Sequence, residues 1–347
     1  MRPFFSEYEP HNIHFINPLW STPLNLACKK GLKNESHIYF WGRKSFPEVE
    51  EFAQKNNIKI FRVEDGFIRS VGLGSDLTQP YSQVIDTRGI YFDPTVESDL
   101  ENLLQNYDFS SNKELLERAK NIQNEIIKNK LSKYNSDTEQ LLNFPKDKAI
   151  ALVTGQVEDD ASIQYGANGK TNLELLQAVK QKYPDRYIVF KPHPDVLSGN
   201  RVGNIPNDEA LKYCDEIVNN ISMASIFEAV DEVHTLTSLT GFEGLVYGKK
   251  VFTYGLPFYA GWGLTIDEQK CERRTKSLVL EELIAATYLL YPRYISPKNR
   301  ELCEVEEVIK ELKKQKDALK NSQYLRIKFT VYNFCSRILQ KLLSVVA

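Results

Sequence analysis

One short stretch limits the possible folds more than any other: an apolar run that stops abruptly at an acidic turn. Residues 149–153, AIALV, predict a short strand that is buried on both faces. Glu158, Asp159 and Asp160 follow it, and a helix is expected to begin near residue 171. Carboxylates after a strand of an α/β protein lie where such proteins bind ligands, in the crevice above the carboxyl end of the sheet. Because adjacent acids repel one another, the turn is either a solvated surface loop or part of a binding site.

The chain alternates predicted strands and helices, which is typical of an α/β fold with parallel strands. Residues 37–41, 46–56 and 58–63 predict strand, helix and strand within about thirty residues, the pattern of a βαβ unit. A second alternating series begins at residue 148. Its expected strands are 149–153, 186–191, 216–218, 232–235 and 250–254, and its expected helices are 171–182, 225–230 and one that ends near 247.

This order predicts two doubly wound domains that face a cleft, followed by helices. We expect an amino-terminal domain at residues 1–147, a carboxyl-terminal domain at 148–295 and carboxyl-terminal helices at 296–347. The other expected elements are a strand pair at 83–86 and 89–92, helices at 97–105, 113–133, 281–290 and 301–321, and an irregular segment at 1–35.

Composition excludes several classes of protein. The chain is 42% hydrophobic and 26% charged with a net charge of −2, which gives no reason to expect nucleic-acid binding. Its five cysteines lie far apart without a CxxC pair, as suits reduced thiols in the cytosol. The amino terminus lacks the apolar core of a signal peptide, and no apolar run reaches the roughly 18–20 residues that cross a bilayer. We therefore expect a cytoplasmic protein.

The final stretch, residues 322–347, predicts a basic amphipathic helix, because no acid follows Asp317. Such a helix can lie on the cytoplasmic face of the inner membrane, attracted by anionic lipid, or it can pack on the protein body. The apolar residues that recur every three or four positions are Leu325, Phe329, Tyr332, Ile338, Leu339, Leu342, Leu343 and Val346, and the basic ones are Lys320, Arg326, Lys328, Arg337 and Lys341.

Besides the acidic turn, which also contains Gln156, three clusters carry candidate chemistry. Glu64 and Asp65 precede a glycine after the strand at 58–63, as an acidic turn or as catalytic carboxylates. His193 lies between two prolines after the strand at 186–191, and Lys191 adds a second cation that suits a phosphate. The last cluster is a hydroxyl-rich helix start, a possible N-cap and anion site, formed by Thr237, Ser238, Thr240, Gly241 and Glu243.

Four stretches resemble the KpsC/KpsS capsule polysaccharide proteins, which are bacterial β-Kdo glycosyltransferases. They are residues 62–75 (RVEDGFIRSVGLGS), 155–162 (GQVEDDAS), 191–195 (KPHPD) and 237–265 (TSLTGFEGLVYGKKVFTYGLPFYAGWGLT). The resemblance runs from about residue 37 to 295 and matches a single KpsC-like module. It implies a GT-B fold, CMP-β-Kdo as the donor and a retaining reaction that gives a β-linked Kdo. It implies neither a metal nor a cofactor.

The resemblance also implies residue roles. Asp160, four residues after Gln156, would attack the anomeric carbon and form a glycosyl-aspartate, and Glu64 would deprotonate the acceptor hydroxyl. His193 would bind the CMP phosphate. The further donor-binding candidates are Lys191, Gln156, Thr237, Ser238, Thr240, Gly241 and Glu243, and Asp65 and Asp159 are additional active-site candidates. From its chemistry rather than from the resemblance, Arg69 is our candidate for the Kdo carboxylate, since a guanidinium suits a planar bidentate partner.

In such systems the product is a poly-Kdo linker built on a lipid of the phosphatidylglycerol type. The expected partners are therefore CMP-Kdo, a lipid-linked glycan or phosphatidylglycerol-type acceptor, and the inner membrane. Three alternatives stay open: a glycosyltransferase that uses CMP-sialic acid or a UDP-sugar, a metal hydrolase that uses Asp159, Asp160, His193 and Asp195, and a non-catalytic component of capsule export or glycan binding.

Overall fold

The computed structural model describes residues 2–16, 21–72, 78–133, 135, 139–197, 201–325, 327–328, 330–332 and 334–336. The chain forms two compact units, one from Met1–Ile90 together with Tyr291–Ala347, and one from Tyr91–Leu290. This division differs from the expected boundaries at 147 and 295. Residues 91–147 belong to the second unit, and the segment after 295 belongs to the first.

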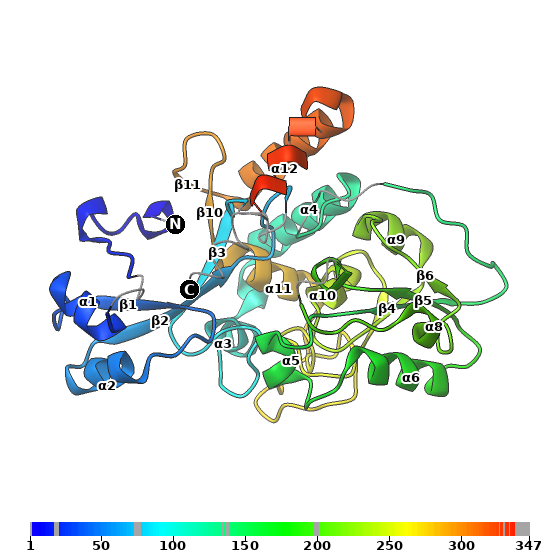
Figure 1. Cartoon of the computed structure of the whole chain (residues 1–347), viewed down its shortest axis with the longest axis horizontal. Helices are drawn as coiled ribbons and strands as arrows, with labels where there is room; N and C mark the ends of the chain where they lie inside the picture. Colours follow the sequence, from blue (N-terminus) through cyan, green and yellow to red (C-terminus); the bar gives the residue numbers. More distant parts are fainter. Residues whose placement is uncertain are drawn as a thin grey trace. The chain divides into compact units, whose positions relative to one another are not determined.

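The second unit contains a six-stranded sheet in which every pairing is parallel, in the order β6-β5-β4-β7-β8-β9. All five residues of β4 (Ile150–Thr154) are buried, because helices cover both faces of the sheet. Helix α6 (Asn172–Lys182) lies on one side of the sheet and α10 (Leu239–Val246) on the other (Figure 1). The other strands are β5 (Tyr187–Lys191), β6 (Glu216–Ile217), β7 (Glu232–Thr235), β8 (Lys250–Thr253) and β9 (Ile266–Asp267).

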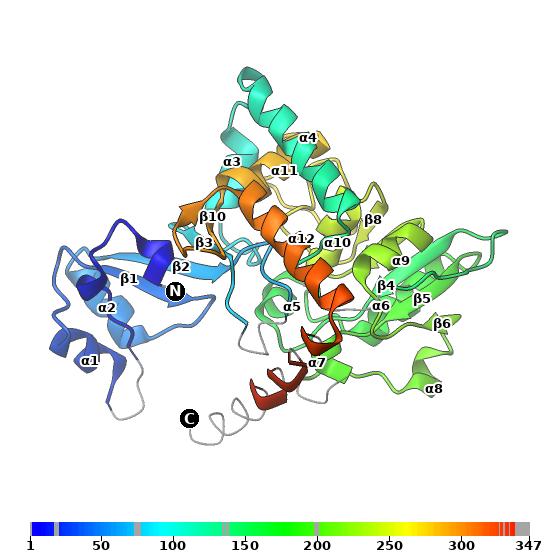
Figure 2. The same cartoon turned by 90° about the horizontal axis from the view of Figure 1, so that it is seen from above.

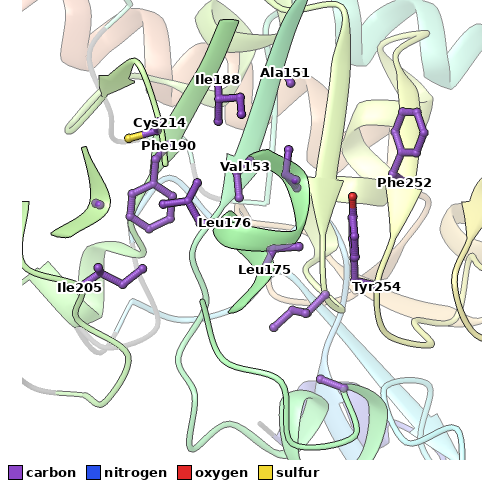
Figure 3. Packing of buried hydrophobic residues seen from close by; sticks show 14 of the residues in the cluster. Ala151, Val153, Leu175, Leu176, Ile188, Phe190, Ile205, Cys214, Phe252 and Tyr254 are labelled. Atoms are coloured by element: carbon purple, nitrogen blue, oxygen red, sulfur yellow. The ribbon is translucent and has the colours of Figure 1, made fainter. Parts of the chain in front are cut away.

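The core of this unit follows the alternation of side chains along the strands. Val153 of β4, Phe190 of β5 and Phe252 of β8 belong to one buried cluster with Leu175 and Leu176 of α6 (Figure 3). On the opposite face, Gly244 of α10 lets that helix approach Val233 and Val251 closely. The sheet is therefore held from both sides, which fixes the positions of the turns at its carboxyl edge.

Helix α4 (Lys113–Lys128) explains why residues 91–147 belong to the second unit. It packs against α11 (Leu280–Ile284) and the π-helix Ala285–Leu290, which together replace the single helix expected at 281–290. Gln123 of α4 also donates a 2.8 Å hydrogen bond to the carbonyl of Val246. The remaining helices of this unit are α3 (Asp99–Asn106), η4 (Phe109–Ser111), α5 (Ala161–Gly166), α7 (Pro194–Leu197), α8 (Asn207–Ala210) and α9 (Met223–Ala229).

The first unit has a mixed five-stranded sheet in the order β1-β2-β3-β10-β11. Only β1 (His37–Trp41) and β2 (Lys59–Asp65) pair in parallel, joined by α2 (Pro47–Lys55) as the βαβ pattern predicts, while β3 (Ser82–Asp86) and the later strands are antiparallel. Helix α12 (Val305–Asn321) packs on β10 (Figure 2). The remaining elements are η1 (Arg2–Phe5), η2 (Pro10–Asn12), α1 (Pro23–Lys29), β10 (Pro292–Ile295) and β11 (Leu302–Cys303).

Several expected elements are absent or altered in the first unit and at its boundary. Residues 89–92 form a turn rather than a strand, and the helix expected at 301–321 begins only at Val305, after β11. Helix α1 lies within the segment that was expected to be irregular. Within the described part of the chain, no helix combines the length and the apolar character needed to cross a membrane.

Much of the expected tail helix lies outside the described residues, namely Arg326, Phe329, Arg337, Ile338, Leu339, Lys341, Leu342, Leu343 and Val346. Among the described tail residues, Leu325 is half-buried. The large apolar side chains that are exposed there are Tyr324, Ile327, Val331, Tyr332 and Phe334.

Candidate active site

The strand order of the second unit reverses between β4 and β7, and the candidate residues follow these two strands. The chain runs from β4 to β5 and β6 on one side of the sheet, and from β7 to β8 and β9 on the other. The hydroxyls of Thr154 and Thr235, at the ends of β4 and β7, are 2.9 Å apart. The acidic turn and the hydroxyl-rich turn therefore begin side by side, at the switch point where open α/β sheets bind ligands.

Gln156 joins the two turns. Its side-chain oxygen accepts a hydrogen bond from the backbone N–H of Thr237 (2.9 Å), and its side-chain nitrogen donates to the Thr237 hydroxyl (3.1 Å). Gln156 was predicted to bind the donor, whereas its amide is used within the protein as a brace between β4 and β7.

Asn172, the first residue of α6, holds the acidic turn in place through side-chain hydrogen bonds. This role was not predicted from the sequence. Its side-chain oxygen accepts from the backbone N–H of Gln156 (2.8 Å), and its side-chain nitrogen donates to the carbonyls of Gln156 (2.7 Å) and Gly203 (2.9 Å). Asn172 is buried, so its amide has lost its contact with water, and these hydrogen bonds compensate for that loss. An Asn at a helix start normally indicates only a cap, and bonds to residues 16 and 31 positions away carry no local signal.

The three acids of the turn have three different partners, which resolves their expected repulsion. Glu158 accepts a 2.7 Å hydrogen bond from the backbone N–H of Asn172. Asp159 forms an ion pair with Arg201, whose Nη2 lies 3.1 Å from its Oδ1. Asp160 is the N-cap of α5.

The Asp160 carboxylate is oriented by Ser162. Its Oδ1 accepts from both the backbone N–H (2.9 Å) and the hydroxyl (2.7 Å) of Ser162. Asp160 is exposed, and its second oxygen has no protein partner among the described residues. One oxygen is therefore held while the other is available, which is the geometry that a carboxylate nucleophile needs.

His193 lies close enough to Asp160 for the two groups to interact electrostatically. Burial lowers the pKa of His193, and the charges of Asp195 and Asp160 oppose this shift, while Arg201 and Lys191 reinforce it. The backbone N–H of Asp195 donates to Nδ1 of His193 (3.2 Å), so a neutral ring carries its proton on Nε2. His193 can thus donate from Nε2 to an anion.

Close backbone packing holds the residues after β5, including His193, against the start of the acidic turn. A Cβ atom on Gly155 would lie 3.1 Å from Cα of Pro192 and 3.3 Å from the backbone nitrogen of His193. Lys191, the other cation predicted here, donates from Nζ to the carbonyl of Ile221 (3.1 Å).

The hydroxyls after β7 mainly stabilise their own turn. The Ser238 hydroxyl caps α10 by accepting from the backbone N–H of Thr240 (3.2 Å), and it lies 3.1 Å from the Thr240 hydroxyl. A Cβ atom on Gly241 would lie 2.2 Å from the hydroxyl of Tyr259, which donates to the carbonyl of Ser238. Gly241, predicted to bind the donor, thus has a packing role.

Glu243 also has a structural partner. Its Oε1 accepts a 2.7 Å hydrogen bond from the backbone N–H of Lys133, in the segment that follows α4. Burial raises the pKa of Glu243 to about 7. Glu243 thus attaches Lys133 to α10, and its role in donor binding stays a prediction.

In the first unit, Glu64 and Asp65 are the last residues of β2 rather than part of a turn. Glu64 accepts from the backbone N–H of Asp65 (2.9 Å). Arg69, the predicted carboxylate ligand, is buried, and its guanidinium donates to Asp65 (2.5 Å) and to the Ser70 hydroxyl (3.0 Å). Its main partners are thus within its own unit. Among all described residues, no three His, Cys, Asp or Glu side chains are grouped as a metal ion would require.

Comparison with known proteins identifies the family of this chain. A family model for capsule polysaccharide biosynthesis proteins matches residues 37–294. The capsule polysaccharide modification protein LipA of Neisseria meningitidis serogroup A / serotype 4A is 44% identical over 295 residues, which are 85% of this chain and 42% of LipA. The lipopolysaccharide-processing protein LpsZ of Rhizobium meliloti is 41% identical over 319 residues, which are 91% of this chain and 72% of LpsZ. The chain thus spans less than half the length of LipA.

Two solved structures of KpsC from Thermosulfurimonas dismutans are also similar. The one described as a beta Kdo 2,4 transferase has a TM-score of 0.72 and 34% identity, with 80% of this chain and 86% of that chain covered. The one described as a beta Kdo 2,7 transferase has a TM-score of 0.67 and 41% identity, with 83% and 87% covered. The resemblance drawn from the four motifs is confirmed. Since the family model covers well over half of its length, the chain belongs to the family of capsule polysaccharide biosynthesis proteins.

Proposed function

We propose that this protein is a retaining β-Kdo glycosyltransferase that transfers Kdo from CMP-β-Kdo to a glycan acceptor in capsule polysaccharide synthesis. The observation that carries the proposal is the Asp160 carboxylate, held on one oxygen by Ser162 and open on the other, at the β4–β7 switch point beside His193. The similarity to KpsC structures described as Kdo transferases supports the choice of sugar.

The reaction is a double displacement. The free oxygen of Asp160 attacks the anomeric carbon, the bond to the phosphate oxygen breaks, and the bonding electrons leave with CMP. The acceptor hydroxyl then attacks the same carbon as Glu64 takes its proton, and the bond to Asp160 breaks. Two inversions at one carbon retain the β configuration. CMP is a stable anion, so its departure needs little acid catalysis.

His193 is proposed to bind the CMP phosphate. Its Nε2–H is available because Nδ1 is occupied by the backbone N–H of Asp195, and the lowered pKa keeps the ring neutral at neutral pH. Lys191 and the start of α10, including Thr237, Ser238 and Thr240, supply further positive potential for a phosphate. The proposal requires no metal and no cofactor.

The acceptor is proposed to be a lipid-linked glycan or a phosphatidylglycerol-type lipid, reached from the cytoplasmic face of the inner membrane. The exposed apolar side chains of Tyr324, Ile327 and Phe334, in a stretch without acids, support contact with an anionic lipid surface. Kdo added to such a lipid would begin or extend the poly-Kdo linker.

The decisive experiment measures the intact mass of the full chain after incubation with CMP-Kdo and no acceptor. The wild type should gain one Kdo, Asp160→Ala should gain none, and Glu64→Gln should accumulate the adduct because the second displacement is slowed. Lys212→Ala, on the surface of the second unit, serves as the matched control and should behave as the wild type.

The same mixtures distinguish the competing assignments. We expect the protein to release CMP from CMP-Kdo at a rate that EDTA does not change. We expect no release of CMP from CMP-sialic acid and no release of UDP from a UDP-sugar. Release only from another donor would replace Kdo by that sugar, and loss of activity in EDTA would favour a metal hydrolase. If no mixture releases a nucleotide, the protein is a binding or export component rather than a transferase.

A further inference from the structure

The segment 201–203 lies directly on the acidic turn. The carbonyl of Val202 accepts a 3.0 Å hydrogen bond from the backbone N–H of Glu158. Gly203 has a φ of +122°, and a Cβ atom there would lie 2.7 Å from the carbonyl oxygen of Gln156. Backbone contacts therefore set the position of Arg201, and its location beside the turn does not depend on its own ion pair.

The guanidinium of Arg201 is only partly used by the protein. Its Nε (3.2 Å) and Nη2 (3.1 Å) both contact Oδ1 of Asp159. Its Nη1 has no partner among the described residues. The side chains are 40% and 48% exposed, and an ion pair so accessible to water contributes little to stability. The pair instead orients the guanidinium through its Nε and Nη2 on Asp159, and the charges of Arg201 and Asp160 both act on His193.

This arrangement fits a sugar that carries a carboxylate on its anomeric carbon. When the oxygen of Asp160 approaches that carbon, the sugar carboxylate is one bond away from the point of attack. Two carboxylates at this separation repel strongly unless a cation lies between or beside them. A planar guanidinium with free N–H groups is the side chain best suited to a carboxylate.

We propose that Arg201 binds the carboxylate of an α-keto acid sugar donor, the class to which Kdo belongs, with Asp159 as the residue that positions it. The proposal rests on the proposed function and refines its donor site. It replaces Arg69 in that role, because the Arg69 guanidinium is buried and bonded to Asp65 and Ser70.

The ion pair between Arg201 and Asp159 also gives the neighbouring residues Asp159 and Asp160 different roles. Asp159 is neutralised by Arg201, and its Oδ1 is occupied twice. Asp160 has no cation bonded to it and keeps one oxygen free among the described residues. Asp160 is therefore the attacking group, and Asp159 acts through Arg201.

The test compares two ligands that differ only in the sugar. Isothermal titration measures the dissociation constants of CMP and of CMP-Kdo for the full chain carrying Asp160→Ala, in which no turnover occurs. Adding Arg201→Ala should weaken CMP-Kdo about 10- to 100-fold, the scale of a lost charge-assisted contact, and leave CMP within about twofold. Arg201→Lys should recover part of the affinity, and Lys212→Ala should change neither ligand.

Three results would overturn the assignment. Equal weakening of CMP and CMP-Kdo by Arg201→Ala means that Arg201 only supports the turn. Unchanged affinity for CMP-Kdo means that another group binds the sugar carboxylate, although the transferase proposal survives. Binding of CMP without any tighter binding of CMP-Kdo by the parent variant overturns both proposals together.

A separate arm tests the division between the aspartates. In the otherwise wild-type chain, Asp159→Asn should still give the Kdo adduct by intact mass, with a raised KM for CMP-Kdo because Arg201 is less well oriented. An adduct that disappears in Asp159→Asn and persists in Asp160→Ala would contradict the assignment.

Discussion

In α10, the buried carboxyl group of Glu243 accepts a hydrogen bond from the backbone N–H of Lys133. Burial raises its pKa from 4.5 to about 7 in the folded protein. Between these two values the folded state holds a proton that the unfolded state has lost. The unfolded state then binds fewer protons, so stability falls as pH rises from about 4.5 to about 7 and stays at the lower level above.

Glu243→Gln should remove this pH dependence. At 1.36 kcal/mol per pKa unit the ionisation penalty above pH 7 is on the order of 3 kcal/mol. We expect the melting temperature of the variant to gain on the wild type between pH 5 and pH 8, while its affinity for CMP stays the same. The exposed Glu117→Gln, on α4 of the same unit, is the control. A difference that is constant with pH would contradict the burial argument.

At the scale of elements, the loop between β7 and α10 packs directly against the segment around Tyr259. The hydroxyl of Tyr259 bonds to the carbonyl of Ser238, and this contact requires the absence of a side chain at position 241. For Gly244, further along α10, the atoms nearest to an added Cβ atom are methyl groups of Val233 and Val251, at 3.1 and 3.3 Å. Two glycines of one helix thus differ in how much room they have.

Gly241→Ala should destabilise the protein and Gly244→Ala should not. A Cβ atom at 241 would lie 2.2 Å from the Tyr259 hydroxyl, so the ring must move, at a cost of about 1–3 kcal/mol. At 244 the small overlap is offset by the better helix propensity of Ala, about 1 kcal/mol. Chemical unfolding of both variants checks this order. Equal stabilities would show that Tyr259 adapts without cost.

The elements that the sequence predicted well are those with a strong local pattern. β4 and β5 are short, mainly apolar runs, and the amphipathic pattern of α4 and α6 has the helical period. β10 was not predicted, and it begins at Pro292, since the first position of a strand tolerates proline. α5 is too short to show a period, and the buried Ile90 made a turn resemble a strand.

The position of the candidate residues at the carboxyl edge of the sheet could be predicted, whereas the detail of their bonds could not, and their roles stay predictions. Strand ends identified Asp160, His193 and the turn at 237–241, because chemistry in α/β folds gathers at the carboxyl edge. The partners of Gln156 and Glu243 could not be predicted, since Thr237 and Lys133 are brought to them only by tertiary packing.

At the scale of the whole molecule, the described part of the tail exposes large apolar side chains in a stretch that has only basic charges after Asp317. We expect the full chain to sediment with phosphatidylglycerol vesicles and not with phosphatidylcholine vesicles. Each Lys or Arg near anionic lipid contributes roughly 1 kcal/mol, and added salt should weaken the binding.

The double variant Ile327→Asp, Phe334→Asp should stay in the supernatant and still release CMP from CMP-Kdo. Leu141→Asp, which changes a still more exposed apolar residue of the second unit, is the control and should sediment normally. If the wild-type chain sediments with neither kind of vesicle, the tail packs on the protein instead of binding lipid.

The two units also differ in the order in which their residues leave the ribosome during synthesis. The second unit is one uninterrupted segment, Tyr91–Leu290, whereas the sheet of the first unit needs β10, which pairs with β3 across more than two hundred intervening residues. During synthesis the second unit can close before the first can complete its sheet. Until β10 emerges, β3 has an unpaired edge, so a nascent chain stalled near residue 290 should be the most aggregation-prone species that this protein passes through.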